Sequence, residues 1–264
     1  MESLLAKTAY PDFEILVADN DSDDPALLAF YERMKADPRF AVVSCPGPFN
    51  FSAINNRAAQ HARGEILGLL NNDLEVMHAE WLDEMVAHAV RPEIGCVGAK
   101  LYYPDFRLQH AGVITGLGGV AGHAFKNFPR HDPGTPQFRP HLVHNVSAVT
   151  AACLVLRKTI FAQAGGFEEH GLKVAFNDVD FCLRVEALGY RNLYTPFAEF
   201  IHHESASRGA EDSPEKIRRF QTEIAFIQAR WGDRLLNDPA YNPNFTLDSE
   251  DFALAYPPRV PLLT

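Results

Sequence analysis

Short apolar runs alternate with amphipathic segments near the start of the chain. Between Pro25 and Asp37-Pro38, apolar side chains recur at helical spacing, which predicts a helix with proline in its first turn. A second helix is expected to be capped by Ser52 and to run through Ala62 before Gly64 ends it. Three runs of five or six mostly apolar residues are typical of strands buried on both faces: 14–18, 40–44 and 65–70.

The resulting order of strand, helix, strand, helix, strand favours an α/β fold. We expect a mostly parallel sheet with helices on both sides. Two polar loops, 19–24 and 71–73, directly follow predicted strands. Because ligands bind at the carboxyl ends of such strands, the two loops are expected to meet at one edge of the sheet and to share a ligand.

The remaining chain continues this pattern with longer connections. We expect residues 112–122 to be irregular because of their glycines, 130–140 to form a loop because of their prolines, and the chain from Asn237 to wrap over the core. The other predicted elements are a helix at 81–90, a strand at 95–101, a β-rich segment at 146–156, a helix at 179–188, a strand at 197–201 and a helix at 215–231.

Composition and charge narrow the classes of protein. The chain has 264 residues, of which 47% are apolar, enough for one large domain or two small ones. Its formal charge of −10 gives no general attraction to nucleic acid, so a phosphate ligand would need a local cation or a metal ion. The four cysteines are far apart and predict reduced thiols, and the sequence shows neither an export signal nor a membrane-spanning run. We therefore expect a cytoplasmic protein.

Three side chains stand out as candidates for chemistry. Asp73 ends Asn71-Asn72-Asp73 after a buried strand, where a carboxylate can hold a divalent cation. Asp178 lies at the start of a predicted helix and could act as a general base, and His202 ends an apolar strand and could complete a metal site. Each also has a purely structural interpretation: a turn for Asp73, a helix cap for Asp178 and a hydrogen-bonded rim residue for His202.

The absence of some enzyme motifs and the presence of a cationic loop narrow the possible functions. The chain has no GxxxxGK[ST] loop, GxGxxG turn, HExxH pair or GxSxG elbow, so kinases, dehydrogenases, zincins and ordinary hydrolases are not favoured. The segment after His202 contains two serines and Arg208, and such a polar, cationic loop suits a diphosphate.

Six motifs follow one another along the chain: Val17-Ala18-Asp19-Asn20-Asp21-Ser22, residues 56–64, Leu70-Asn71-Asn72-Asp73, Gly165-Gly166-Phe167, residues 177–184 and residues 202–209. In this order they resemble family 2 glycosyltransferases with the GT-A fold, especially bacterial enzymes of O-antigen, capsule and cell-wall polysaccharide synthesis, including rhamnosyltransferases. The similarity continues through Trp231-Gly232 and residues 238–243 and covers nearly the whole chain.

The resemblance implies a role for each of these residues. Asp178 would be the catalytic base, and Asp73 and His202 would hold Mg²⁺ or Mn²⁺. The donor nucleotide sugar would be contacted by Asp19, Asn55, Asn56, Asn71, Asn72, Asp73 and Arg208. The acceptor side would be lined by Thr150, Gly166, Phe167 and Asp180.

The implied reaction is an in-line transfer with inversion, from a UDP or dTDP sugar to a glycan or lipid-linked acceptor. The sequence leaves peripheral membrane association and a homodimer open. Compared with the family, the chain starts within the first helix, so the fold is expected to lack the first strand. We expect residues 1–210 to form this GT-A-like domain and 211–264 to add a helix and tail to it. A non-catalytic nucleotide-sugar binding or scaffold domain is the main alternative, and a nucleotidyltransferase is a weaker one.

Overall fold

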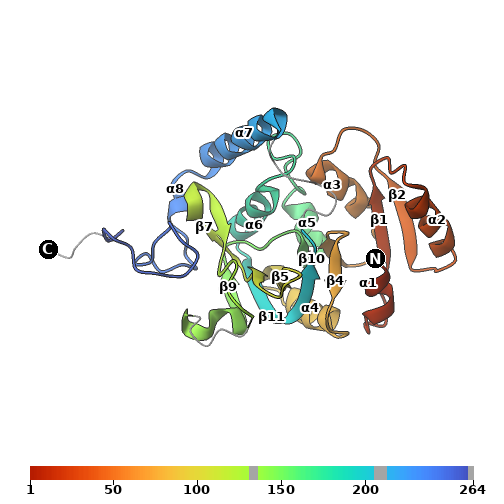
Figure 1. The fold of residues 1–264 in the computed structure, drawn as a ribbon, viewed down its shortest axis with the longest axis horizontal. Coiled ribbons are helices and arrows are strands. Elements are labelled where there is room, and N and C mark those ends of the chain that lie inside the picture. Colours follow the sequence, from red (N-terminus) through yellow and green to blue (C-terminus); the bar gives the residue numbers. More distant parts are fainter. Residues whose placement is uncertain (131–135, 205–212, 261–264) are drawn as a thin grey trace.

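The computed structural model describes residues 1–130, 136–204 and 213–260, and it shows helices packed around a large β-sheet, with a smaller two-stranded sheet at one end (Figure 1). The first three predicted strands are present as β1 (Ile15–Asp19), β2 (Phe40–Ser44) and β3 (Ile66–Leu70). The α/β architecture predicted from the alternating pattern is therefore confirmed.

The larger sheet has seven strands and mixed directions. Its order is β3-β10-β5-β11-β4, with β6 paired to β5 and β9 paired to β11. Only β5 and β11 run parallel within it, so the expected mostly parallel sheet is corrected to a mixed one. The bounds are β4 (Leu74–Val76), β5 (Ile94–Tyr102), β6 (Leu108–His110), β9 (His144–Val146), β10 (Cys153–Arg157) and β11 (Arg191–His202).

The smaller sheet contains only β1 and β2, which are parallel. Within the described residues, β1 pairs on one edge with β2 and β3 pairs on one edge with β10, so no strand pairing joins the two sheets. All five residues of β1 are only half-buried, whereas all nine residues of β5 are buried.

Most predicted helices are present, although one cap differs. The Asp24 carboxylate caps α2 by accepting from the backbone N–H of Ala26. Asn50, and not Ser52, caps α3, because Ser52 lies inside the helix and its hydroxyl donates to the carbonyl of Leu172 at 2.5 Å. The bounds are α1 (Glu2–Lys7), α2 (Pro25–Met34), α3 (Phe51–His61), α4 (Trp81–Ala89), α5 (Lys158–Gln163), α6 (Asn177–Ala187), α7 (Pro214–Trp231) and α8 (Asp233–Leu236).

The glycine-rich segment expected to be irregular contains an antiparallel hairpin. Its strands are β7 (Val113–Thr115) and β8 (Ala121–His123), joined through the short 3₁₀ helix η1 (Leu117–Gly119). The glycines supply positive φ angles in the connection, at Gly116, Gly118 and Gly119. The predicted loop at 130–140 includes a second 3₁₀ helix, η2 (Pro136–His141), and its residues 131–135 lie outside the described chain.

Two apolar layers cover the larger sheet. Trp81 and Met85 of α4 pack on one side of it, with Trp81 edge-on to Phe200 of β11. On the other side, α6 contributes Phe181, Cys182 and neighbouring apolar residues. All four cysteines are buried free thiols, as expected.

The C-terminal tail packs against the hairpin end of the molecule. Phe252 stacks on Phe125 with ring centroids 4.5 Å apart, and Tyr241 packs against both Phe252 and Phe245. This tail and the β1–β2 sheet lie at opposite ends of the molecule (Figure 1). In the part of the chain that is described, no helix combines the length and apolar character needed to cross a membrane.

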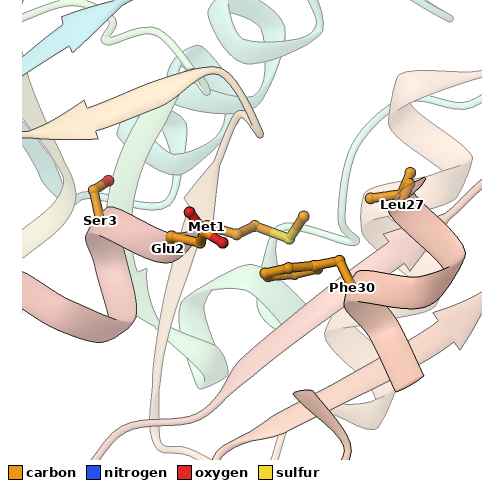
Figure 2. A pocket seen from close by; sticks show the side chains of 5 residues that line it. All are labelled: Met1, Glu2, Ser3, Leu27 and Phe30. Carbon is orange, nitrogen blue, oxygen red and sulfur yellow. The ribbon is translucent and has the colours of Figure 1, made fainter. Parts of the chain in front are cut away.

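A hollow of about 340 Å³ lies between α1 and α2, lined by Met1, Glu2, Ser3, Leu27 and Phe30 (Figure 2). The side chain of Met1 extends toward the ring of Phe30. None of the residues that the sequence analysis selected lines this hollow, so it is separate from the chemistry described next.

Candidate functional site

The Asn71-Asn72-Asp73 motif forms a turn between β3 and β4. The backbone N–H of Asn71 donates to the carbonyl of Ala152 just before β10, at 2.9 Å. On the other side, the carbonyl of Asp73 accepts from the backbone N–H of His203, at 3.0 Å. These two bonds fix the turn between the end of β11 and the turn that leads into β10.

His202 is the last residue of β11, and its ring faces the Asp73 turn. The Nε2 atom lies 3.1 Å from Asp73 Oδ1 and 3.3 Å from Asn71 Nδ2. The Nδ1 atom lies 2.6 Å from Oε1 of Gln109. The side chains of His202 and Asp73 are only 10% and 15% exposed, so solvent screens this pair weakly.

The donor set of this pair fits a divalent cation. An amide oxygen can only accept, so the proton of a neutral His202 ring belongs on Nδ1 and Nε2 presents a lone pair to Asp73. Two acceptors 3.1 Å apart repel each other unless a proton or a cation lies between them. In residues 1–130, 136–204 and 213–260, no group of three His, Cys, Asp or Glu side chains could hold a metal ion, so a cation here would take its remaining ligands from substrate phosphates and water.

Asp178 lies in the first turn of α6, where the helix dipole favours a carboxylate. Its Oδ2 accepts from the backbone N–H of Ala151 at 3.1 Å, and its Oδ1 accepts from that of Val179 at 2.8 Å. Ala151 belongs to the same turn that receives Asn71 through Ala152. The turn formed by residues 150–152 therefore holds Asp178 next to the Asn71–Asp73 motif, and Thr150 lies in this turn with 9% exposure.

Two further histidines lie in this region, and the sequence analysis did not select them. Nδ1 of His110, on β6, is 3.1 Å from Nδ1 of His123, on β8. Burial lowers the pKa of His110 well below its usual range, and the nearby rings of His123 and His202 lower it further. Burial also lowers the pKa of His123, although the carboxylates of Asp178 and Glu204 oppose the effect. The ring of His202 therefore affects the pKa of His110, and the carboxylate of Asp178 affects the pKa of His123.

A sequence signal for these residues existed but was weak. Gln109 and His110 are polar residues in the fully buried strand β6, and His123 follows a glycine-rich segment. Their proximity depends on the pairing of His110 with Leu101 across β6 and β5, which the local pattern does not specify.

The residues assigned to the donor side are divided between β1 and α3, which hold Asp19, Asn55 and Asn56, and the turn after β3, which holds residues 71–73. Asp19 ends β1, and its carboxylate accepts from the hydroxyl of Tyr31 at 3.2 Å and from the backbone N–H of Ser22 at 3.4 Å. The Asn55 amide donates to the carbonyl of Phe51 within α3. Asn72 is exposed on its turn. Arg208 lies outside the described residues, as do the two serines of its loop.

Asn56 and Gly166 were assigned to opposite substrates, yet they meet in one structural contact. The Asn56 amide donates to the carbonyl of Phe167 at 2.9 Å, and its oxygen accepts from the backbone N–H of Phe167 at 2.8 Å. Gly166 has φ +69°, and a Cβ there would lie 2.5 Å from Asn56 Oδ1. Asn56 therefore anchors the Gly165-Gly166-Phe167 loop to α3.

Two expectations for the acceptor side are corrected by burial. Phe167 is 3% exposed, and its ring packs against Phe161 and Phe181 in the core. Asp180 is fully buried, where it pairs with Arg184 and accepts from the indole N–H of Trp231. A side chain with both oxygens engaged inside the protein does not line an acceptor surface.

Comparison with known proteins identifies related sequences. The model of glycosyl transferase family 2 matches residues 1–161. The chain is 51% identical over 258 residues to the uncharacterized protein y4gI of Sinorhizobium fredii, and 43% identical over 259 residues to the O-antigen biosynthesis protein RfbC of Myxococcus xanthus. These alignments cover 97% and 98% of the chain but only 28% and 20% of those longer relatives.

A more distant relative and two solved structures extend the comparison. The N-acetylglucosaminyl-diphospho-decaprenol L-rhamnosyltransferase of Mycobacterium tuberculosis is 25% identical over 87% of the chain and 79% of its own length. GalNAc-T7 with UDP, GalNAc and Mn²⁺ has a TM-score of 0.67 at 14% identity, over 89% of the chain and 45% of its own. The mannosyltransferase PcManGT from Pyrobaculum calidifontis, in complex with GDP-Man and Mn²⁺, has a TM-score of 0.54 at 16% identity, over 86% and 65%. The structural likeness confirms the predicted GT-A fold.

Proposed function

Because the chain belongs to glycosyl transferase family 2, we propose that it transfers a sugar from a nucleoside-diphosphate donor to a glycan or lipid-linked acceptor, with inversion at the anomeric carbon. The similarity to an O-antigen biosynthesis protein and to a rhamnosyltransferase supports bacterial surface polysaccharide as the product. The observation that carries the proposal is the turn at residues 150–152, which contacts Asp178 through one residue and Asn71 through the next.

In this proposal, Asp73 and His202 hold a divalent cation at the donor diphosphate. The bound cation would neutralise the negative charge that develops on the leaving diphosphate oxygens. The Mn²⁺ that accompanies nucleotide ligands in the structures of GalNAc-T7 and PcManGT supports this assignment. Asn71 is proposed to contact the donor, and its amide nitrogen lies 3.3 Å from Nε2.

Asp178 is proposed as the base that receives the acceptor proton. As the bond from the acceptor oxygen to the anomeric carbon forms and the bond to the diphosphate breaks, the hydroxyl proton would pass to the Asp178 carboxylate. Its bonds from the Ala151 and Val179 N–H groups hold the carboxylate in a fixed orientation. Thr150 precedes Ala151, which contacts Asp178, so Thr150 is proposed to contribute to the acceptor side. Asp19, Asn55 and Asn72 are proposed to contact the donor nucleotide.

The test is sugar transfer or donor hydrolysis with Mg²⁺ or Mn²⁺, comparing the wild type with Asp178→Asn. Loss of the base should lower turnover by about 10²- to 10⁴-fold. Asp83→Asn is the matched control, because Asp83 is exposed on α4 and should tolerate the same change. Equal turnover by the wild type and Asp178→Asn would remove Asp178 from the base role, and metal-dependent nucleotide binding without any turnover would favour a binding domain instead.

A further inference from the structure

Gln109 lies at the centre of β6 and connects two charged or titratable side chains. It is 3% exposed. Its amide oxygen lies 2.6 Å from Nδ1 of His202, and its amide nitrogen donates to Oε2 of Glu204 at 3.0 Å. No role for Gln109 follows from the family resemblance or from the relatives described above.

The Glu204 carboxylate determines which way the Gln109 amide points. An ionised carboxylate only accepts hydrogen bonds, so the NH₂ group of Gln109 must face Glu204 and the amide oxygen must face His202. The amide oxygen in turn accepts only from a protonated ring nitrogen. Charge on the acceptor strengthens the first of these bonds, which makes reversal of the amide unfavourable.

We propose that Gln109 is a positioning residue that keeps the proton of His202 on Nδ1, so that the lone pair of Nε2 faces Asp73. The opposite tautomer would place a bare Nδ1 against the Gln109 oxygen, and its Nε2–H would donate to Asp73 Oδ1 at 3.1 Å. That bond would occupy both groups at once. Gln109 therefore keeps the Nε2 lone pair of His202 available to a cation.

The expected effect on metal binding rests on the metal role proposed for His202. The position of the ring proton does not, because it can be measured without metal or activity. The primary experiment is ¹⁵N NMR of the His202 ring, which shows whether Nδ1 carries a proton. We expect the wild type to carry a proton on Nδ1, whether or not Nε2 is also protonated, and Gln109→Leu to lose the proton from Nδ1. Gln228→Leu is the matched control, since Gln228 lies on α7 and donates to the carbonyl of Gly119.

Two further variants separate orientation from packing. Glu204→Ala changes an exposed residue that orients the amide, and it should produce a mixture of the two ring tautomers. The exchanged pair Gln109→Glu with Glu204→Gln restores an acceptor facing His202 and a donor facing residue 109, so it should return the proton to Nδ1. A role in filling space alone predicts no such rescue.

Titration with Mn²⁺ alone, followed by electron paramagnetic resonance, tests the consequence. Gln109→Leu should weaken Mn²⁺ binding by about 10- to 100-fold, the usual effect of removing a group that orients a metal ligand, and the exchanged pair should recover it. A wild-type ring without a proton on Nδ1, or a ring unchanged in Gln109→Leu and Glu204→Ala, would overturn the inference. Unchanged Mn²⁺ binding by His202→Ala would instead overturn the metal role in the proposed function, while the ring measurement still decides the position of the proton.

Discussion

At the scale of single residues, His110 links stability to pH. Burial holds its pKa well below the usual range, so the folded protein keeps it neutral while the unfolded chain binds a proton below about pH 6.5. Because the unfolded state then binds more protons, the free energy of unfolding should fall as pH decreases, by up to about 1.4 kcal/mol per pH unit from this residue.

His110→Asn should therefore reduce this loss. We expect urea unfolding between pH 7.5 and 5.5 to show a shallower decrease for the variant than for the wild type, even where its stability at pH 7.5 is lower. His61→Gln, which changes an exposed histidine of α3, should keep the wild-type slope. An equal slope in His110→Asn would show that His110 does not remain neutral in the folded state.

Gly166 gives a second prediction at this scale. It has φ +69°, and an added Cβ would meet the Asn56 amide oxygen at 2.5 Å, which would break the bonds that hold Phe167. Gly165 also has a positive φ, +79°, but its Cβ position is open. We expect both Gly→Ala variants to pay backbone strain of about 1–2 kcal/mol, with Gly166→Ala less stable by about 1 kcal/mol or more. Equal unfolding free energies would contradict the role given to Asn56.

The site residues that sequence could predict are those marked by their position in an element. Asp73 and His202 each follow or end an apolar strand, and Asp178 begins a helix, so local pattern makes them candidates and the family resemblance supplies their proposed roles. Gln109, His110 and His123 were missed because their proximity depends on strand pairing across the sheet. Asp180 and Phe167 were misassigned because burial in the core depends on packing with Trp231 and Phe181, which lie far away in the sequence.

At the scale of elements, features that depend on interactions within one segment were predicted, and features that depend on pairing between distant segments were not. The helix α2 begins at Pro25 as predicted, because its cap and proline are encoded within the segment, and it ends at Met34, before the expected stop at Asp37-Pro38. The directions of β3 and β10 were not predicted, because an apolar run has the same composition in either direction. The hairpin β7–β8 was not predicted, because glycines usually indicate an irregular segment. Here they form the connection between the two strands and allow close packing.

The C-terminal tail depends on one buried carboxylate. Asp238 is 7% exposed and accepts from the backbone N–H of Thr115 at 2.8 Å, the hydroxyl of Ser147 at 2.6 Å and the backbone N–H of Ala240 at 2.8 Å. Asp238→Ala would leave buried donors unsatisfied, each costing about 1–3 kcal/mol.

We therefore expect Asp238→Ala to lower the free energy of unfolding by roughly 3 kcal/mol or more and to speed proteolysis within residues 239–260. Asp251→Ala is the control, because Asp251 is an exposed tail carboxylate that bonds only to nearby Ser249 and Ala253. A tail equally resistant to protease in both variants would show that its aromatic contacts are sufficient without Asp238.

At the scale of the whole molecule, stability is distributed unevenly between the two sheets. Strand β5 is buried along its length between β10 and β11, whereas β1 is half-buried and, among the described strands, pairs only with β2. The N-terminal end of β1 is tied to the chain before β3 by the ion pair of Glu14 with Arg63, which is largely exposed at the arginine and contributes about 0–1 kcal/mol.

Regions with few buried contacts open at lower free energy than the core, so β1 and β2 should exchange their backbone hydrogens before β5 and β11 do. Hydrogen exchange followed by mass spectrometry tests this directly, with peptides from 15–19 and 40–44 compared with peptides from 94–102. Arg63→Ala should raise exchange in β1 slightly and leave β5 unchanged, because the Glu14–Arg63 ion pair joins the start of β1 to the chain before β3 and does not involve β5. Uniform protection across both sheets would mean that they unfold as one cooperative unit despite the absence of strand pairing between them in the described chain.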